Sequence, residues 1–269
     1  MGRIGRSFQL VGQSYRVLMQ DKELMILPLI SGSVIVTAVA AFTFGFGVDS
    51  EKLQQRGPEL YVPLFLMYVV TYTVGIFFQA AVIAGATQRM RGGDPTIKSA
   101  LAAAASRIGA IVMWAVVAAT VGMILRAIHD RAGFVGKIIA SLLGAAWSLA
   151  TFFVVPVLVL EERTVGESYS RSTAVFKQTW GETVVGGINL AVAAVCSWVT
   201  LVAVSGLLAM LIGTPALAVF AMGAVCLMVF FSALQGVYVA SLYRYATDGQ
   251  TAPGFDKAIF EQAFRPKNR

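Results

Sequence analysis

Residues 161–181 read EERTVGESYSRSTAVFKQTWG. This charged stretch lies between two uncharged apolar runs, and each run is long enough to cross a bilayer. Thr164 and Glu167 have the spacing of a capping box, which predicts that a helix starts there. Apolar residues then recur at helical spacing. The stretch is therefore predicted to form an amphipathic elbow helix, residues 164–180, that lies flat on the membrane between two spans.

The composition indicates an integral membrane protein. Of the 269 residues, 57% are hydrophobic and only 13% are charged, and the mean hydropathy is +0.75. Soluble domains carry about 25% charged residues. Lipid acts as the solvent for so much apolar surface once every backbone polar group is bonded within a helix. The alternating pattern of membrane β-strands is not seen, so the predicted fold class is all-α integral membrane.

Six uncharged runs predict six transmembrane helices within a single transmembrane domain, residues 1–269. Each run meets or approaches the roughly 20 residues that a helix needs to cross the hydrocarbon core. The predicted spans are about 24–48, 60–86, 108–126, 137–160, 183–212 and 214–243. Pro156 interrupts the fourth span, and residues 126–137 are expected to form a loop after the third.

Interfacial amphipathic helices are expected before each pair of spans and at the C-terminus. Their predicted bounds are about 2–20, 94–107, 164–180 and 253–264. In the first helix, steps of three and four separate the apolar residues Ile4, Phe8, Val11, Tyr15 and Leu18. In the second, Asp94 is expected to cap the helix and Pro95 to occupy its first position. The predicted layout is three hairpins, each preceded by a cytoplasmic interfacial helix.

The basic residues predict the orientation. Of the 21 Lys and Arg residues, 16 lie in the interfacial segments and the tail, and five lie on the opposite side. By the positive-inside rule, both termini are cytoplasmic, and the protein is a multi-pass protein of the inner (plasma) membrane. The net charge of +7 then favours anionic headgroups, at up to about 1 kcal/mol per well-placed cation. Nucleic acid is not expected as a partner, because no basic groove with interleaved aromatic residues is visible.

Short matches within the chain indicate an internal repeat. Residues 14–20, SYRVLMQ, line up with residues 172–178, STAVFKQ. Gln79 lies ten residues before Arg89, as Gln235 lies ten residues before Tyr245. The repeated unit would be one interfacial helix followed by two spans, occurring three times.

Two stretches also resemble a known family. They are Arg6 and Ser7 through DKELMILPLISG at 21–32, and residues 167–180. Together they resemble an uncharacterised family of prokaryotic six-span membrane proteins, a domain of unknown function. The second stretch is also similar in style to the membrane-domain repeats attached to some glycerophosphodiester phosphodiesterases, although their catalytic domain has no counterpart here. The resemblance implies the six-span topology and brings no catalytic residues.

No catalytic constellation is visible in the sequence. His129 is the only histidine and lies beside Asp130, but a hydrolytic site would also need a nucleophile or a metal. Cys196 and Cys226 lie inside apolar runs, where we expect small buried hydrophobic residues rather than a disulfide or metal ligands. We therefore expect a protein that is not an enzyme, with no cofactor and no metal site.

The remaining site candidates are polar residues in the spans and cations at their ends. The centres of the spans carry no charged residue, which argues against ion-coupled transport. Gln79, Asn189 and Gln235 would form interhelical hydrogen bonds or line a polar pathway. The expected headgroup contacts are Arg3, Arg6, Arg16, Arg89, Arg91, Lys98, Arg107, Arg171 and Lys177.

These features predict a non-enzymatic structural or accessory membrane protein. Its expected partners are membrane lipids, preferentially anionic headgroups on the cytoplasmic side, or a membrane protein, which includes a second copy of the chain. A channel or passive transporter for a small solute or lipid is the alternative. A membrane hydrolase is the third hypothesis.

Overall fold

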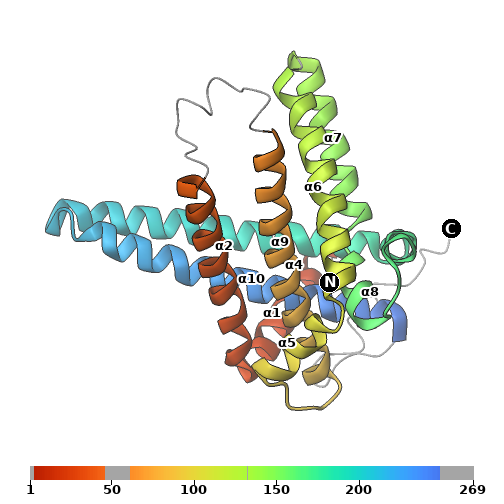
Figure 1. The fold of residues 1–269 in the computed structure, drawn as a ribbon. Helices are drawn as coiled ribbons and strands as arrows, with labels where there is room; N and C mark the ends of the chain where they lie inside the picture. The colour runs from red at the N-terminus through yellow and green to blue at the C-terminus, as the bar shows by residue number, and fades with distance from the viewer. Residues whose placement is uncertain (1–2, 46–60, 132, 249–269) are drawn as a thin grey trace. The chain divides into compact units, whose positions relative to one another are not determined.

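The computed structural model describes residues 3–45, 61–131 and 133–248, and the regular structure in this part of the chain is all helical (Figure 1). Six helices here are long and apolar enough to cross a membrane. They are Lys22–Gly45, Val62–Met90, Ile108–Arg131, Phe134–Leu160, Gly187–Ile212 and Ala216–Asp248. The predicted all-α class and the six apolar helices are confirmed. The predicted helix 253–264 lies outside the described residues.

The chain divides into two compact units. In chain order the helices are α1 (Arg3–Gln20), the 3-10 helix η1 (Lys22–Met25), α2 (Ile26–Gly45), α4 (Tyr61–Met90), α5 (Ile97–Ala105), α6 (Ile108–Arg131), α7 (Phe134–Ala150), α8 (Val154–Leu160), α9 (Val165–Ile212) and α10 (Ala216–Asp248). Unit 1 comprises Met1–Leu29, Val82–Ala100 and Lys177–Arg269, and unit 2 comprises Ile30–Ala81 and Leu101–Phe176. The single transmembrane domain over residues 1–269 stays a prediction.

The third predicted interfacial helix and the fifth predicted span form one helix, α9. The sequence predicts a break at residues 181–182, where polar residues give way to apolar ones. A change of polarity does not interrupt the backbone hydrogen bonds of a helix, and α9 contains no proline that would remove a donor. The helix therefore continues through the change of polarity.

The fourth predicted span is instead broken at residues 151–153, between α7 and α8. Pro156 lies in the first turn of α8, where its missing N–H would have no helical partner. If the helix continued upstream, the proline ring would clash with the carbonyl of residue 152. The position of the break therefore follows from the proline.

Two further predictions about this part of the chain are wrong. Residues 126–131, expected in a loop, continue α6 as far as Arg131. His129 and Arg131 lie in its last turn, where a positive charge is favoured by the partial negative charge of the helix C-terminus. Cys196 and Cys226 are exposed rather than buried, because an apolar position in a spanning helix can face lipid as well as protein.

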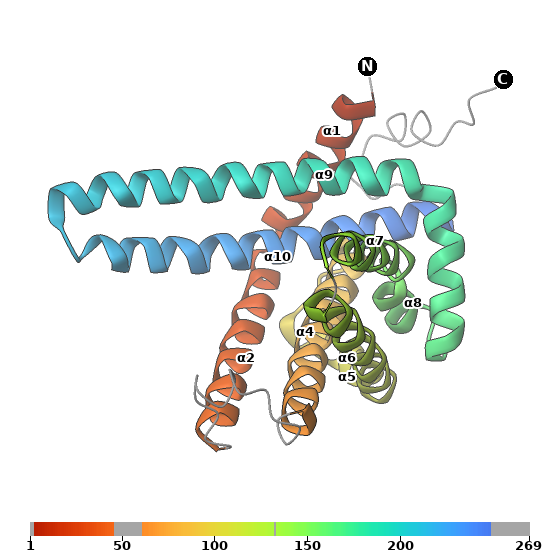
Figure 2. The same ribbon diagram turned by 90° about the horizontal axis from the view of Figure 1, so that it is seen from above.

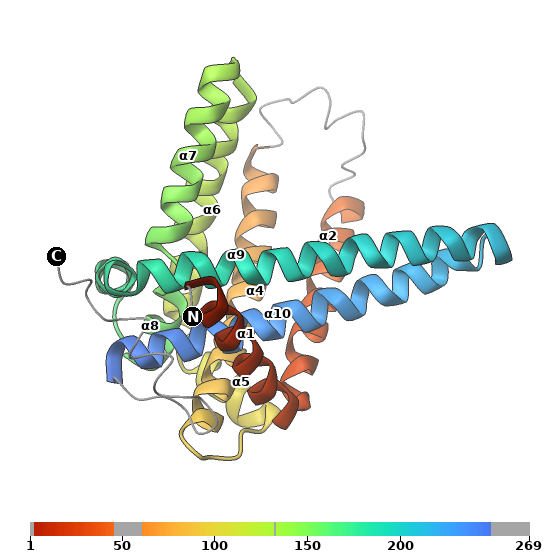
Figure 3. The same cartoon turned by 180° about the vertical axis from the view of Figure 1, so that it is seen from behind.

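In unit 1, α1 lies across α10 (Figure 3). The buried residues in the C-terminal half of α1 are Gln13, Ser14, Val17 and Leu18. The predicted apolar stripe is only partly buried, because Leu18 is fully covered while Tyr15 is 46% exposed and meets the ring of Phe230 edge-on. In the C-terminal half of α1, the buried face is therefore not quite the face that the spacing of the apolar residues predicts.

Close approaches at glycines set the packing of α10 in unit 1. A Cβ atom at Gly236 would lie 2.5 Å from Cγ1 and 3.2 Å from Cβ of Val82 on α4. Helices α9 and α10 also run side by side (Figure 2). There, a Cβ atom at Gly223 would lie 2.5 Å from Cδ1 of Leu201 on α9.

In unit 2, α6 and α7 pack against each other through aromatic rings. The rings of Trp114 and Trp147 stack with their centroids 5.7 Å apart. Trp147 also stacks on Tyr169 of α9, at 6.0 Å. These rings connect α6, α7 and the first turns of α9.

Substitution of Gly236 by alanine should destabilise the protein by about 1–3 kcal/mol, since the new methyl group would overlap the stiff, β-branched side chain of Val82. Gly206 is the matched control, because a Cβ atom there meets nothing within 4 Å. Gly206→Ala should leave stability unchanged or raise it by about 0.5–1 kcal/mol. Unfolding of the full-length protein in detergent micelles measures both changes, and equal stabilities of the two variants would contradict this packing.

Candidate functional site

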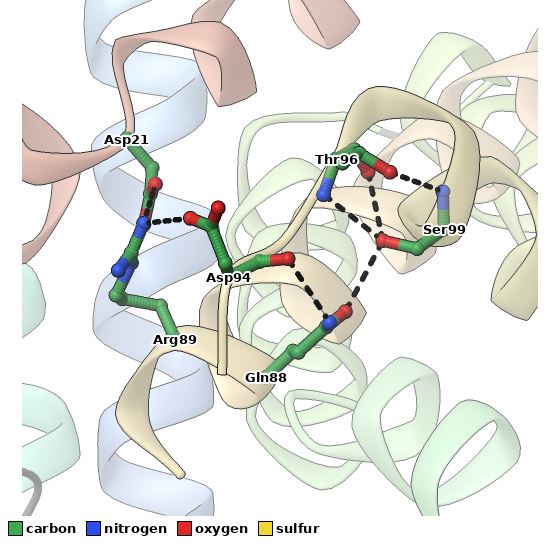
Figure 4. A network of polar contacts seen from close by, with 6 residues as sticks. All are labelled: Asp21, Gln88, Arg89, Asp94, Thr96 and Ser99. Carbon is green, nitrogen blue, oxygen red and sulfur yellow. Dashed lines mark hydrogen bonds and ion pairs between the residues drawn. The ribbon is translucent and has the colours of Figure 1, made fainter. Parts of the chain in front are cut away.

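Polar side chains gather in unit 1 where α4 ends and α5 begins (Figure 4). We call Asp21, Gln88, Arg89, Asp94, Thr96 and Ser99 the Arg89 cluster. Arg89 donates from Nε and Nη2 to the two carboxylate oxygens of Asp21, and its Nη2 lies 2.7 Å from Oδ1 of Asp94. The side chain of Asp21 is 8% exposed, whereas that of Asp94 is 89% exposed. The pair with Asp21 is therefore the desolvated one, and it joins the start of the first span to the end of the second.

The same cluster starts α5. The N–H of Ser99 donates to Oγ1 of Thr96, and the N–H of Thr96 donates to Oγ of Ser99, each at 3.0 Å. The Ser99 hydroxyl also donates to Oε1 of Gln88 at 3.2 Å. The predicted cap at Asp94 is wrong. Thr96 caps α5, because the carboxylate of Asp94 is drawn to the positive charge of Arg89.

Arg244 joins the end of α10 to the end of α4 within unit 1. Its Nη1 donates to the carbonyl of Met90, the last residue of α4. The Arg244 side chain is buried, with 9% exposure. The last carbonyls of a helix lack intrahelical donors and carry partial negative charge, so a guanidinium stabilises them. Sequence reasoning missed this residue, although its position at the end of an apolar run was visible.

A second polar cluster lies in unit 2, where α8 ends and α9 begins. The two carboxylate oxygens of Glu161 accept hydrogen bonds from Nε of Arg163 at 2.5 Å and from Nε of Arg171 at 3.0 Å. Arg107 donates to the carbonyls of Leu158 at 3.1 Å and of Arg163 at 3.0 Å. An arginine from another segment thus caps the end of α8, as an arginine caps the end of α4. We call Glu161, Arg163, Arg171 and Arg107 the Glu161 cluster.

Thr164 and Glu167 form the predicted capping box at the start of α9. The hydroxyl and the N–H of Thr164 donate to Oε2 of Glu167, at 2.8 Å and 3.0 Å. These two hydrogen bonds hold the pKa of Glu167 below its usual range, because they favour the ionised carboxylate. This prediction is confirmed.

Ser172 satisfies the backbone at the break between α7 and α8. Its hydroxyl donates to the carbonyl of Ala150 at 2.7 Å and accepts the N–H of Phe153 at 3.1 Å. Both Ser172 and Phe153 are fully buried. One side chain of α9 therefore satisfies one backbone acceptor and one backbone donor at the break.

The cations predicted to contact headgroups differ in their surroundings. Arg89, Arg107 and Arg171 have partners within the chain, as described above. Arg16, Arg91, Lys98 and Lys177 are exposed, and all four belong to unit 1. The side chains of Arg3 and Arg6 lie outside the described residues. Contact of any of these cations with lipid stays a prediction.

The three polar residues of the spans are not gathered within one unit. Gln79 belongs to unit 2 and is half-buried. Asn189 and Gln235 belong to unit 1, where Asn189 is 7% exposed and Gln235 lies on an exposed part of α10. A shared pathway lined by the three stays a prediction.

His129 and Asp130 lie at the end of α6. The distance from Nδ1 of His129 to Oδ1 of Asp130 is 3.8 Å, and Arg126 lies 3.9 Å from the same carboxylate. Among the described residues, no three His, Cys, Asp or Glu side chains are grouped so that they could hold a metal ion. The geometry here is that of an ion pair on an exposed helix end.

A family model described as a family of unknown function, DUF6159, matches residues 59–255. This match confirms the predicted likeness to an uncharacterised domain family. Neither a curated protein nor a solved structure matches the chain. The likeness of one stretch to the membrane repeats of phosphodiesterases stays a prediction.

Removal of Arg89 should destabilise unit 1 strongly. Arg89→Gln leaves the carboxylate of Asp21 buried without its cation and should cost about 3 kcal/mol. Asp94→Asn is the control on the other side of the same guanidinium, and because Asp94 is exposed it should cost less than about 1 kcal/mol. Thermal unfolding in micelles measures both. If the double variant Asp21→Asn with Arg89→Gln were no more stable than Arg89→Gln alone, the cost would not come from the unpaired carboxylate.

Substitution of Ser172 by alanine should cost about 1–3 kcal/mol, because the N–H of Phe153 and the carbonyl of Ala150 would lose their partner in a buried place. Ser170→Ala, on the exposed side of the same helix, should change stability little. Amide hydrogen exchange at Phe153 gives a local measurement, and it should accelerate in Ser172→Ala only. Equal exchange in both variants would show that Ser172 does not hold the break.

Proposed function

The chain belongs to the family of unknown function DUF6159, and we propose that it is a non-enzymatic, multi-pass structural or accessory protein that binds anionic lipid headgroups. In this proposal the six spans form three hairpins in the inner (plasma) membrane. Each hairpin is preceded by an amphipathic helix in the cytoplasmic interface, and both termini are cytoplasmic. The interfacial helices bring basic side chains to the level of the headgroups.

The proposal rests on the different surroundings of the cations, some of which have partners within the chain while others are exposed. Arginines that have carboxylate or carbonyl partners hold helix ends in place, as Arg89 and Arg107 do. Arg16, Lys98 and Lys177 are exposed instead, and they lie on α1, α5 and α9 respectively. These are the three helices that contain the interfacial segments of the proposal. Exposed Lys and Arg residues on such helices attract anionic headgroups.

The polar clusters also support a threefold repeat. After α4, an arginine caps the final carbonyl, and Thr96 then opens the next helix with a reciprocal cap. After α8, Arg107 caps a carbonyl of the last turn, and Thr164 opens α9 in the same manner. The two helix ends, which belong to different units, therefore have the same pattern: an arginine donates to a carbonyl of the ending helix, and a threonine caps the next helix. A repeated unit of interfacial helix and hairpin would produce such a correspondence.

The partners of two buried or half-buried carboxylates support the proposal that the protein is not an enzyme. Asp21 and Glu161 each accept hydrogen bonds from arginine, so that both carboxylates are occupied in holding segments of the chain together. The polar clusters therefore connect segments of the chain by hydrogen bonds and ion pairs. A channel or passive transporter for a small solute or lipid stays the alternative, with Gln79, Asn189 and Gln235 as the candidate pathway residues.

The proposal predicts a loss of anionic-lipid dependence when the exposed cations are neutralised. The variant Arg16→Gln, Lys98→Gln, Lys177→Gln should lose most of the extra thermal stability that phosphatidylglycerol gives over phosphatidylcholine in mixed micelles, up to about 1 kcal/mol per cation. The effect in the unmodified protein should shrink as salt is raised, because exposed charges are screened.

The matched control neutralises three exposed cations of the side predicted to be external. Arg126→Gln, Arg131→Gln, Lys137→Gln makes the same change in net charge and should retain the phosphatidylglycerol effect. Equal losses in the two triple variants would indicate that only net charge matters, and the proposed cytoplasmic headgroup surface would be rejected.

A further inference from the structure

One exposed face of α10 carries two polar side chains in an otherwise apolar part of the helix. Ser232 and Gln235 lie on the same face, because residues three apart are neighbours on a helix surface, and both are exposed. Along the helix axis, Gln235 lies about 14 Å before Arg244, the first charged residue of α10. If α10 spans a membrane, its amide is within the hydrocarbon core, which is about 30 Å thick. In this respect the inference rests on the proposed function.

The amide of Gln235 needs a hydrogen-bonding partner from outside α10. Among the described residues, no side-chain hydrogen bond is formed by Ser232 or Gln235. A hydroxyl in a helix can turn to a carbonyl of the preceding turn, as those of Ser197 and Thr200 on α9 do. A glutamine side chain instead carries two N–H donors and a carbonyl acceptor, and lipid tails offer no partner for them.

The exposed positions before Gln235 have the spacing of a helix-pairing seam. Six exposed residues, which we call the Gln235 face, follow one another at steps of three and four: Ala218, Ala221, Val225, Met228, Ser232 and Gln235. This spacing lets two helices pack side by side at a small crossing angle, and alanines allow their backbones to approach closely. Gly223, which meets Leu201 of α9, lies on the opposite side of α10. The Gln235 face therefore stays open when α9 and α10 pack together (Figure 2).

We propose that the Gln235 face pairs with the same face of a second copy of the chain, so that the two Gln235 amides bond to each other across a twofold axis. Two copies inserted in the same direction hold Gln235 at the same depth, and in a parallel helix pair each seam residue meets its own counterpart. A carboxamide is self-complementary, because its N–H donates to the carbonyl of an identical side chain. A second copy therefore supplies the polar partner that lipid tails lack, and it gives the proposed structural protein a defined partner.

The first test is oxidative cross-linking of the full-length protein in phosphatidylcholine liposomes at a high lipid-to-protein ratio. The background Cys196→Ser, Cys226→Ser removes the two exposed thiols, and Met228→Cys then places one thiol on the Gln235 face. Oxidation should convert this variant into a disulfide-linked dimer. Met222→Cys is the matched control and should stay largely monomeric. Met222 is 69% exposed and Met228 is 61% exposed, but the two lie about a third of a turn apart around the helix.

The second test makes the same substitution at two glutamines. Gln235→Leu removes the donors and the acceptor while keeping a side chain of similar size. The protein density needed for half-maximal association, measured by energy transfer between labelled copies in the same liposomes, should rise about three- to tenfold, the loss expected for one or two interhelical hydrogen bonds. Gln79→Leu makes the identical change in α4 and should leave association unchanged. Gln235→Asn keeps the amide and should weaken association less than Gln235→Leu.

The outcomes decide between pairing of two copies and other partners of Gln235. The proposal is overturned if Met228→Cys forms no more dimer than Met222→Cys, or if Gln235→Leu leaves association unchanged. A lowered thermal midpoint of Gln235→Leu with unchanged association would show that the amide is bonded within its own chain. Failure of the proposed function would appear separately, as an equal phosphatidylglycerol response of the two triple variants, because none of those cations lies on the Gln235 face.

Discussion

A desolvated ion pair between Asp21 and Arg89 fixes the arrangement of unit 1. Asp21 lies in the turn between α1 and η1, where its carbonyl accepts the N–H of Leu24 at 3.0 Å. Its carboxylate is nearly inaccessible to water, so the charge must be matched by a cation with suitable geometry. The planar fork of arginine provides two parallel donors, which a lysine would not. The entry to the first span and the end of the second are thereby held together although they are 68 residues apart.

A related requirement recurs at other helix ends in the described part of the chain. The last carbonyls of a helix lack intrahelical donors and need partners from elsewhere wherever water does not reach them. Arg244 serves the end of α4, Arg107 the end of α8, and Ser172 both sides of the break after α7. Polar side chains from other segments therefore set which helix ends meet. Apolar packing then follows along the helices, at positions such as Gly236 and Val82.

The sequence predicts those features that depend on neighbouring residues. The six apolar runs and the Thr164 capping box need only local spacing, and the structure confirms them. The cap of α5 is mispredicted, because Asp94 instead forms an ion pair with Arg89 of the preceding helix. The continuity of α9 is not predicted, because a change of polarity along the sequence does not interrupt the backbone hydrogen bonds of a helix. The chain gives no local sign of Arg244 as a cap, because its acceptor at Met90 is 154 residues away.

Counting charges cannot predict which cations remain available for lipid. Arg89 and Arg91 are two residues apart and would be equivalent in any sum of basic residues, yet Arg89 binds Asp21 while Arg91 is exposed. The helix ends between them at Met90, and Gly92 follows with a φ of +83°, a conformation that favours glycine. The N–H of Gly92 donates to the carbonyl of Arg89 at 2.9 Å, which closes the turn. A helix end thus gives two arginines that are two residues apart different surroundings, because one is paired within its own chain and the other is exposed.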